Sequence, residues 1–79
     1  MQAAKLLEVI ARSLVDKPEG VSVTEVENTD GTLTLELTVA DGDMGKVIGR
    51  GGRVARAIRQ VMKSASSVAG RKIFIEIKD

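Results

Sequence analysis

The sequence predicts an α+β fold in which the order of elements is helix, strand, strand, helix, helix, strand. Apolar residues recur at helical spacing between Leu6 and Leu14 and again over 53–68. In contrast, Thr32–Val39 and Ile73–Ile77 alternate apolar and polar side chains. Only one face of each alternating strand is apolar. We therefore expect a three-stranded mixed sheet with three helices packed on one face.

The first element is a helix, because Leu6, Leu7, Ile10 and Leu14 share one face at helical spacing. The segment 16–20, Asp-Lys-Pro-Glu-Gly, ends this helix, since proline cannot continue a helix and glycine permits a turn.

Two strands joined by a hairpin are expected next. The segment 21–27 is rich in β-branched residues, but its alternation slips between Val23 and Val26, which indicates a β-bulge. The Asp30-Gly31 pair is a hairpin turn signal. In Thr32–Val39 the alternation is regular, so this strand has one buried face.

The second half of the chain predicts two helices and a last strand. Asp41 or Asp43 is expected to cap a short helix over 44–48, and glycines at 49–52 stop that helix. A longer helix is expected over 53–68, ended by Gly70. This two-helix crossover favours parallel pairing of the flanking strands, which places the second strand in the centre.

Composition predicts one small domain over residues 1–79 that is not an enzyme. Cysteine and histidine are absent, which excludes disulfides, the usual zinc sites and Cys–His catalysis. No nucleotide-binding glycine motif is present, so we expect no cofactor and no metal. No apolar run approaches the roughly 18 residues of a membrane span, and Glu8 interrupts any signal-like start. We expect a cytoplasmic protein with no membrane contact.

Charge is segregated along the chain, although the net charge is only +1. Residues 44–72 contain no acidic residue and eight basic ones: Lys46, Arg50, Arg53, Arg56, Arg59, Lys63, Arg71 and Lys72. A block of one sign marks either an anion-binding surface or a solvated helix face. We assign Arg59 and Lys63 to a solvated face, and Arg53 and Arg56 to phosphate contact.

The segment 45–58, GKVIGRGGRVARAI, resembles the signature of KH domains: Val-Ile-Gly, two variable residues, a second glycine and then a helix. The order of elements resembles the type II KH fold, and the size resembles the small bacterial single-KH proteins of the KhpA family. The resemblance makes residues 49–52 a GXXG loop, in which Arg50 and Gly51 are the variable pair. The additional glycine, Gly51, departs from the usual pattern and is expected to make the loop more flexible.

The loop residues also have the properties of a phosphate site. Gly49 and Gly52 lack a Cβ and allow close approach of the backbone, and the loop leads into a helix N-terminus. KH domains hold the backbone of about four nucleotides in this way, and the resemblance implies that Val47 and Ile48 line the groove for the bases. The candidate residues for binding single-stranded RNA are Lys46, Val47, Ile48, Gly49, Arg50, Gly51, Gly52, Arg53 and Arg56.

Aromatic content separates the classes of RNA-binding domain. Phe74 is the only aromatic residue, whereas modules that stack bases use several aromatic side chains. The resemblance implies RNA binding of low sequence specificity, as an RNA chaperone or post-transcriptional regulator. Two alternatives remain open: a DNA-binding helix–turn–helix module, and a protein-interaction module without RNA binding.

A dimer is expected from the long helix, whose apolar arc is wider than one stripe. Ala55, Ile58, Met62 and Ala65 form a stripe for the core, and the candidate dimer interface is the neighbouring stripe of Ala57, Val61, Ser64 and Val68. Alternatively, this second stripe packs on the first helix. The partner is a second copy or, as the resemblance implies, a larger KH-containing protein of the KhpB kind.

Overall fold

A computed structural model describes residues 2–78, so the expected domain range of 1–79 extends one residue beyond it at each end. The elements are α1 (Ala3–Leu14), β1 (Ser22–Glu27), β2 (Leu33–Thr38), α2 (Met44–Ile48), α3 (Arg53–Ala69) and β3 (Ile73–Lys78), with short 3₁₀ turns at Pro18–Gly20 and Arg50–Gly52. This order confirms the predicted fold class. Among the helices of residues 2–78, none is both long and apolar enough to cross a membrane.

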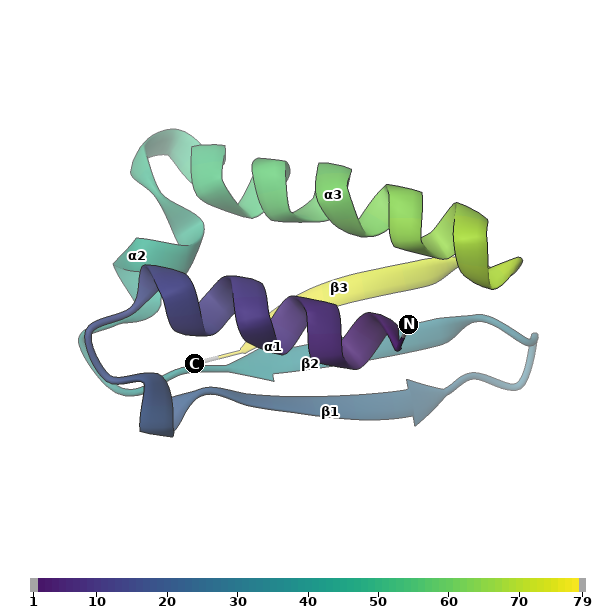
Figure 1. Cartoon of the computed structure of the whole chain (residues 1–79), viewed down its shortest axis with the longest axis horizontal. Helices are drawn as coiled ribbons and strands as arrows, with labels where there is room; N and C mark the ends of the chain where they lie inside the picture. Colours follow the sequence, from purple (N-terminus) through teal and green to yellow (C-terminus); the bar gives the residue numbers. More distant parts are fainter. Residues whose placement is uncertain (1, 79) are drawn as a thin grey trace.

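The sheet has the order β1-β2-β3, with β2 in the centre. β1 pairs with β2 in antiparallel fashion, and β3 pairs with β2 in parallel, as the hairpin and the two-helix crossover predict. α1 and α3 lie over the same face of the sheet (Figure 1). α2 and the loop that leads into α3 lie beyond the carboxyl end of β2, at one end of this helical layer.

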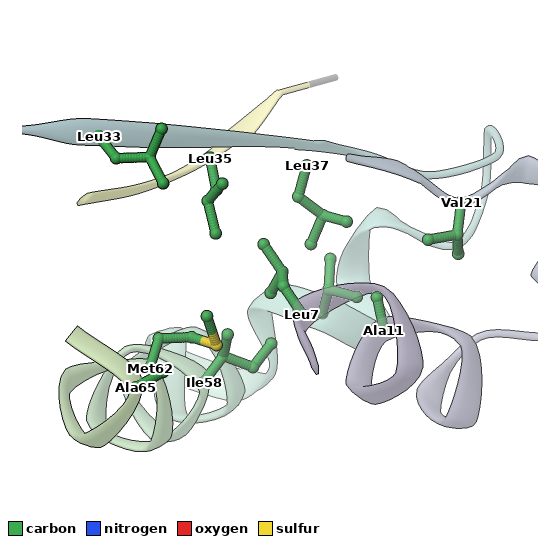
Figure 2. Packing of buried hydrophobic residues seen from close by; sticks show 10 residues of the cluster. Leu7, Ala11, Val21, Leu33, Leu35, Leu37, Ile58, Met62 and Ala65 are labelled. Carbon is green, nitrogen blue, oxygen red and sulfur yellow. The ribbon is translucent and has the colours of Figure 1, made fainter. Parts of the chain in front are cut away.

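The core lies between the sheet and the two long helices. Leu33, Leu35 and Leu37 of β2 point from the sheet toward α1 and α3 (Figure 2). Facing them are Leu7 and Ala11 of α1 and Ile58, Met62 and Ala65 of α3, all buried. The predicted core stripe of the long helix is therefore confirmed.

The buried face of α1 is rotated from the predicted one. Leu7 and Ala11 are fully buried, whereas Leu6 and Ile10 are half-buried and Leu14 is 38% exposed. Apolar spacing alone favoured the larger side chains, but the close approach of α1 to the sheet admits a small residue, Ala11, at the contact.

The β-bulge expected between Val23 and Val26 is absent from β1, so that prediction is wrong. Pairing runs without interruption from Ser22 opposite Thr38 to Glu27 opposite Leu33. Val26 lies opposite Thr34, on the face that the helices leave uncovered, because directly opposed residues share a face. The pattern slips because Glu25 takes a helix-facing position opposite Leu35 and is exposed at the edge of the sheet.

Candidate nucleic-acid interface

The segment that carries the candidate site begins at Asp43, whose side chain does not cap α2 as expected. Asp43 occupies the N-cap position but makes no side-chain capping bond, and it is only 3% exposed. Its carboxylate instead accepts hydrogen bonds from the backbone N–H groups of Asp16, at 3.3 Å, and Lys17, at 3.0 Å. Asp43 therefore ties the start of α2 to the chain that follows α1.

The four residues of the GXXG loop form a tight turn between α2 and α3. Gly49, Gly51 and Gly52 have φ values of 76°, 62° and 79°, a region that disfavours any residue with a Cβ. A Cβ on Gly49 would also lie 2.5 Å from Cγ2 of Val54, so the first loop glycine is required by contact as well as by conformation. The additional glycine, Gly51, has its own left-handed φ, so it shapes this turn.

Arg56 supports the loop from α3. Its Nη1 donates a hydrogen bond to the backbone carbonyl of Gly51, at 3.0 Å. The guanidinium also lies close to Gly52, where an added Cβ would come within 3.5 Å of Nη1. Arg56 was predicted to contact phosphate. In the structure, one of its N–H groups is instead used to hold the loop backbone at Gly51.

A helix N-terminus without a side-chain cap and two arginines meet at the start of α3, where the N–H of Arg53 already donates to the Arg50 carbonyl. The N-cap residue, Gly52, has no side chain to satisfy the first N–H groups of the helix. Arg50 and Arg53 are exposed on either side of Gly52. The positive end of the helix dipole adds to their charge, so this surface suits an anion.

Lys46 lies one turn before the loop, and its ammonium group is 3.5 Å from a carboxylate oxygen of Asp16. Both side chains are substantially exposed, so water and salt screen this pair. Lys46 therefore remains accessible to a second anion.

The two candidate groove residues that precede the loop differ in exposure. Ile48 is half-buried and reaches the surface. Val47 is fully buried and packs in the core, so the expectation that it lines an open groove is wrong. The sequence motif marks Val47 because the core needs an apolar residue there to anchor α2.

The candidate dimer stripe lies exposed along α3. Val61 is 47% and Val68 79% exposed, and Ala57 and Ser64 are exposed as well. α1 does not cover this stripe: an open apolar groove of about 530 Å³ separates the two helices. Its apolar lining comes from Leu6, Ile10 and Leu14 of α1 and from Val54, Ala57 and Val61 of α3.

The other flank of α3 holds residues that the sequence did not single out for binding. Arg59 and Lys63, assigned to a solvated face, line a second groove together with Lys72 and Phe74 of the β3 segment. The sequence signal was available in the i, i+4 spacing of Arg59 and Lys63 and in the lone aromatic residue. Only the placement of β3 beside α3 brings these residues together.

The described residues 2–78 contain no group of three or more His, Cys, Asp or Glu side chains arranged to hold a metal ion.

The fold and the candidate site share three features with one class of nucleic-acid-binding domain. These features are a glycine turn between two helices, arginines at the start of the second helix, and a sheet in which β2 and β3 are parallel. Together they define a KH domain of type II. The family model "KhpA/KhpB, KH domain" matches residues 4–77, and the chain belongs to this family.

Relatives of similar length support the assignment. The chain is 52% identical over 73 residues to the RNA-binding protein KhpA of Clostridium perfringens, covering 92% of this chain and 96% of that protein. It is 45% identical over 75 residues to the RNA-binding protein KhpA of Chlamydia trachomatis, covering 95% of each.

Solved structures with the same fold come from a larger protein. The chain superposes on Aquifex aeolicus Era bound to GDP·AlF4⁻ with a TM-score of 0.67 and 19% identity, covering 95% of this chain. Era in complex with MgGDPNP and nucleotides 1506–1542 of 16S ribosomal RNA gives the same TM-score and identity. This chain spans only 29% and 28% of those two chains, so the likeness concerns the fold of one part of Era.

Proposed function

We propose that this chain binds single-stranded RNA through the GXXG loop and the first turn of α3. The observation that carries the proposal is the loop geometry, in which three glycines with positive φ lead into an uncapped helix N-terminus beside Arg50. Backbone N–H groups at a helix N-terminus, together with arginine, bind phosphate well. The relatives named RNA-binding proteins support RNA as the source of that phosphate.

The site favours RNA binding of low sequence specificity. Contacts to the phosphate backbone position a nucleic acid without reading its bases. We therefore propose a role as an RNA chaperone or post-transcriptional regulator in the cytoplasm, with no chemical step performed by the chain.

The test of the site is Arg50→Glu, measured by fluorescence anisotropy with a labelled random-sequence single-stranded RNA. Affinity should fall roughly tenfold or more, because an attractive phosphate contact becomes repulsive. Lys5→Glu is the matched control, since it makes the same charge change on an exposed residue of α1. Equal affinities of the two variants would show that the loop is not the site.

The two alternative functions give different results in the same assay. A helix–turn–helix module would prefer duplex DNA, and its recognition helix would enter the major groove. We expect duplex DNA to compete poorly with single-stranded RNA, because the loop holds a flexible backbone. A pure protein-interaction module would bind neither nucleic acid at any ionic strength.

We also infer that the α1–α3 groove is an interface with a second KH domain. The groove is lined almost entirely by apolar side chains of two helices, which is the kind of surface that a partner's apolar side chains can cover. Val61 lies at the groove and Val68 follows it along the stripe of Ala57, Val61, Ser64 and Val68. The partner is a second copy of this chain or a larger, KhpB-like KH protein, whose KH domain falls under the same family model.

A further inference from the structure

The chain that follows α1 runs beside the start of α2 (Figure 1) and is fixed there by backbone hydrogen bonds. The buried carboxylate of Asp43 accepts the backbone N–H groups of Asp16, at 3.3 Å, and Lys17, at 3.0 Å. The backbone N–H of Lys46 donates to the carbonyl of the same residue, Asp43, at 2.9 Å. Asp43 therefore sets the positions of Asp16 and Lys46 relative to each other.

This arrangement places a carboxylate against a lysine of the candidate RNA site. Oδ2 of Asp16 lies 3.5 Å from Nζ of Lys46, although the Asp16 side chain is 77% exposed. The attraction within an exposed pair of this kind is weak, because water screens it. Another anion can therefore displace the carboxylate from Lys46, but it has to compete with Asp16 to do so.

We propose that Asp16 is an internal competitor of RNA phosphate for Lys46 and that it lowers the affinity of the site. Carboxylate and phosphate oxygens are both anionic acceptors for the same ammonium group. A phosphate that takes the place of Asp16 also leaves an unpaired negative charge close to itself. This inference rests on the proposed function, because it assumes that the phosphates of RNA are held beside the GXXG loop.

The chemistry of lysine argues against the opposite role, in which Asp16 would orient Lys46 toward RNA. An ammonium group is a compact charge with three donors on a flexible stem, so it needs no partner to present it. Arg56 differs, because its planar guanidinium donates to a neutral carbonyl, that of Gly51, and keeps its positive charge uncompensated. Asp16 instead offsets the charge that it contacts.

Competition of this kind also affects the dependence of binding on salt. While Lys46 remains paired with Asp16, it neutralises no phosphate of the RNA. The slope of log affinity against log salt should then be smaller, by up to about 0.7, than for a chain in which Lys46 is free. Removal of the carboxylate should strengthen binding and steepen the salt dependence together, whereas a general loss of stability would do neither.

The test is Asp16→Asn, measured by fluorescence anisotropy with the labelled random-sequence RNA over a range of salt concentrations. Asparagine keeps the size of the side chain and the backbone N–H that bonds to Asp43. Affinity at low salt should rise about two- to fivefold, the effect of one exposed ion pair, and the slope should steepen by up to about 0.7. Glu19→Gln is the matched control, since it removes the same charge from another exposed residue of this connection, and it should leave the slope unchanged.

A second background shows whether the effect passes through Lys46. In Lys46→Gln, the Asp16→Asn change frees no ammonium group, so the salt slope should stay the same. An equal gain in affinity and slope with and without the lysine would overturn the proposal, because Lys46 would not be the group for which Asp16 competes. Circular dichroism checks that each variant is folded.

The outcomes separate this inference from the proposed function. If Arg50→Glu weakens RNA binding but Asp16→Asn leaves affinity and slope unchanged, Asp16 does not compete, and the proposed function stands. A lower affinity of Asp16→Asn would show that Asp16 orients Lys46, which also overturns the inference. If Arg50→Glu and Lys5→Glu bind RNA equally well, the loop is not the site and both proposals are wrong.

Discussion

Single side chains decide how the segment around the GXXG loop is held, and Asp43 is the least expected of them. A carboxylate before a short helix predicts a cap, but this one is buried and accepts bonds from two backbone N–H groups across the fold. Sequence spacing reveals neighbours along the chain, whereas Asp16 and Lys17 approach Asp43 only after α1 packs on the sheet. The role of Asp43 was therefore not accessible from the sequence.

Replacing Asp43 with alanine should destabilise the fold by about 2–3 kcal/mol, because two partly buried hydrogen bonds from backbone N–H groups to a charged acceptor are lost. Urea unfolding followed by circular dichroism measures this loss. Asp41→Ala removes a neighbouring carboxylate that is exposed, and it should have little effect. Equal midpoints for the two variants would show that the bonds of Asp43 contribute nothing.

Arg56 allows a test that separates support of the loop from contact with phosphate. Arg56→Lys keeps the positive charge but loses the planar group that reaches the Gly51 carbonyl. RNA affinity should fall a few-fold with an unchanged salt slope, whereas Arg50→Gln should lower the slope by about 0.7. Arg56→Gln tests the other role: a slope lowered by about 0.7, as for Arg50→Gln, would identify Arg56 as a phosphate ligand.

At the scale of the elements, apolar–polar alternation predicted the central strand β2 correctly but did not predict the edge strand β1. β2 alternates without a break because it is central, with one face under the helices. β1 is an edge strand, and Glu25 remains exposed in a helix-facing position, so the rule that links apolar residues to the core fails there. The bulge was predicted because every helix-facing position of β1 was expected to be apolar, which holds for a central strand but not for this edge strand.

The hairpin of β1 and β2 is held to the end of α3 by Arg71. Its guanidinium donates two hydrogen bonds to the Glu27 carboxylate, at 2.5 and 3.2 Å, and also reaches the backbone carbonyls of Gly31 and Thr32. The hydrogen bonds from Arg71 lower the pKa of Glu27 below its ordinary value of 4.5. The unfolded chain lacks this contact, so Glu27 binds protons more weakly in the folded state.

The contribution of this pair to stability should depend on pH. Because the folded pKa of Glu27 is depressed, the stabilisation is present above pH 4.5 and is lost as the pH falls through the folded pKa. Glu27→Gln should therefore lower Tm at pH 7, and the difference from wild type should vanish in strong acid. A difference that is the same at both pH values would exclude the ion pair as its source. Hydrogen bonds from Thr32 also lower the pKa of Asp30 from its ordinary value, but Asp30 is common to both chains.

At the scale of the whole molecule, the fold and the loop were predictable, and the two grooves were not. The loop is a local motif within four residues, and its flanking helices follow from spacing alone. Each groove instead lies between α3 and a distant element, α1 on one side and β3 on the other. Grooves of this kind depend on distances between packed elements, which no pattern along the chain records.

Assembly is tested by Val61→Arg, which places a charge in the α1–α3 groove. Sedimentation should show a dimer for the wild-type chain and a folded monomer for the variant, because a buried unpaired charge opposes association. Lys63→Glu is a control on the other flank of α3 and should remain dimeric. A wild-type chain that is monomeric alone but associates with a KhpB-like protein would identify the heterodimer.

An unfolded variant would instead show that Val61 supports the core, although its side chain is 47% exposed. A folded variant that remains dimeric would place the interface elsewhere on the molecule. Circular dichroism distinguishes the first of these outcomes from a true loss of association.

The placement of the only aromatic ring outside the core has a consequence for spectroscopy. With no Trp or Tyr in the chain, absorbance near 280 nm is very weak, and RNA that copurifies with the protein is visible at 260 nm almost without background. Phe74 also provides the only aromatic side-chain signals in a proton NMR spectrum. Since any aromatic ligand placed against this exposed ring would shift those signals through its ring current, one uncrowded spectral region reports directly on contacts made at Phe74.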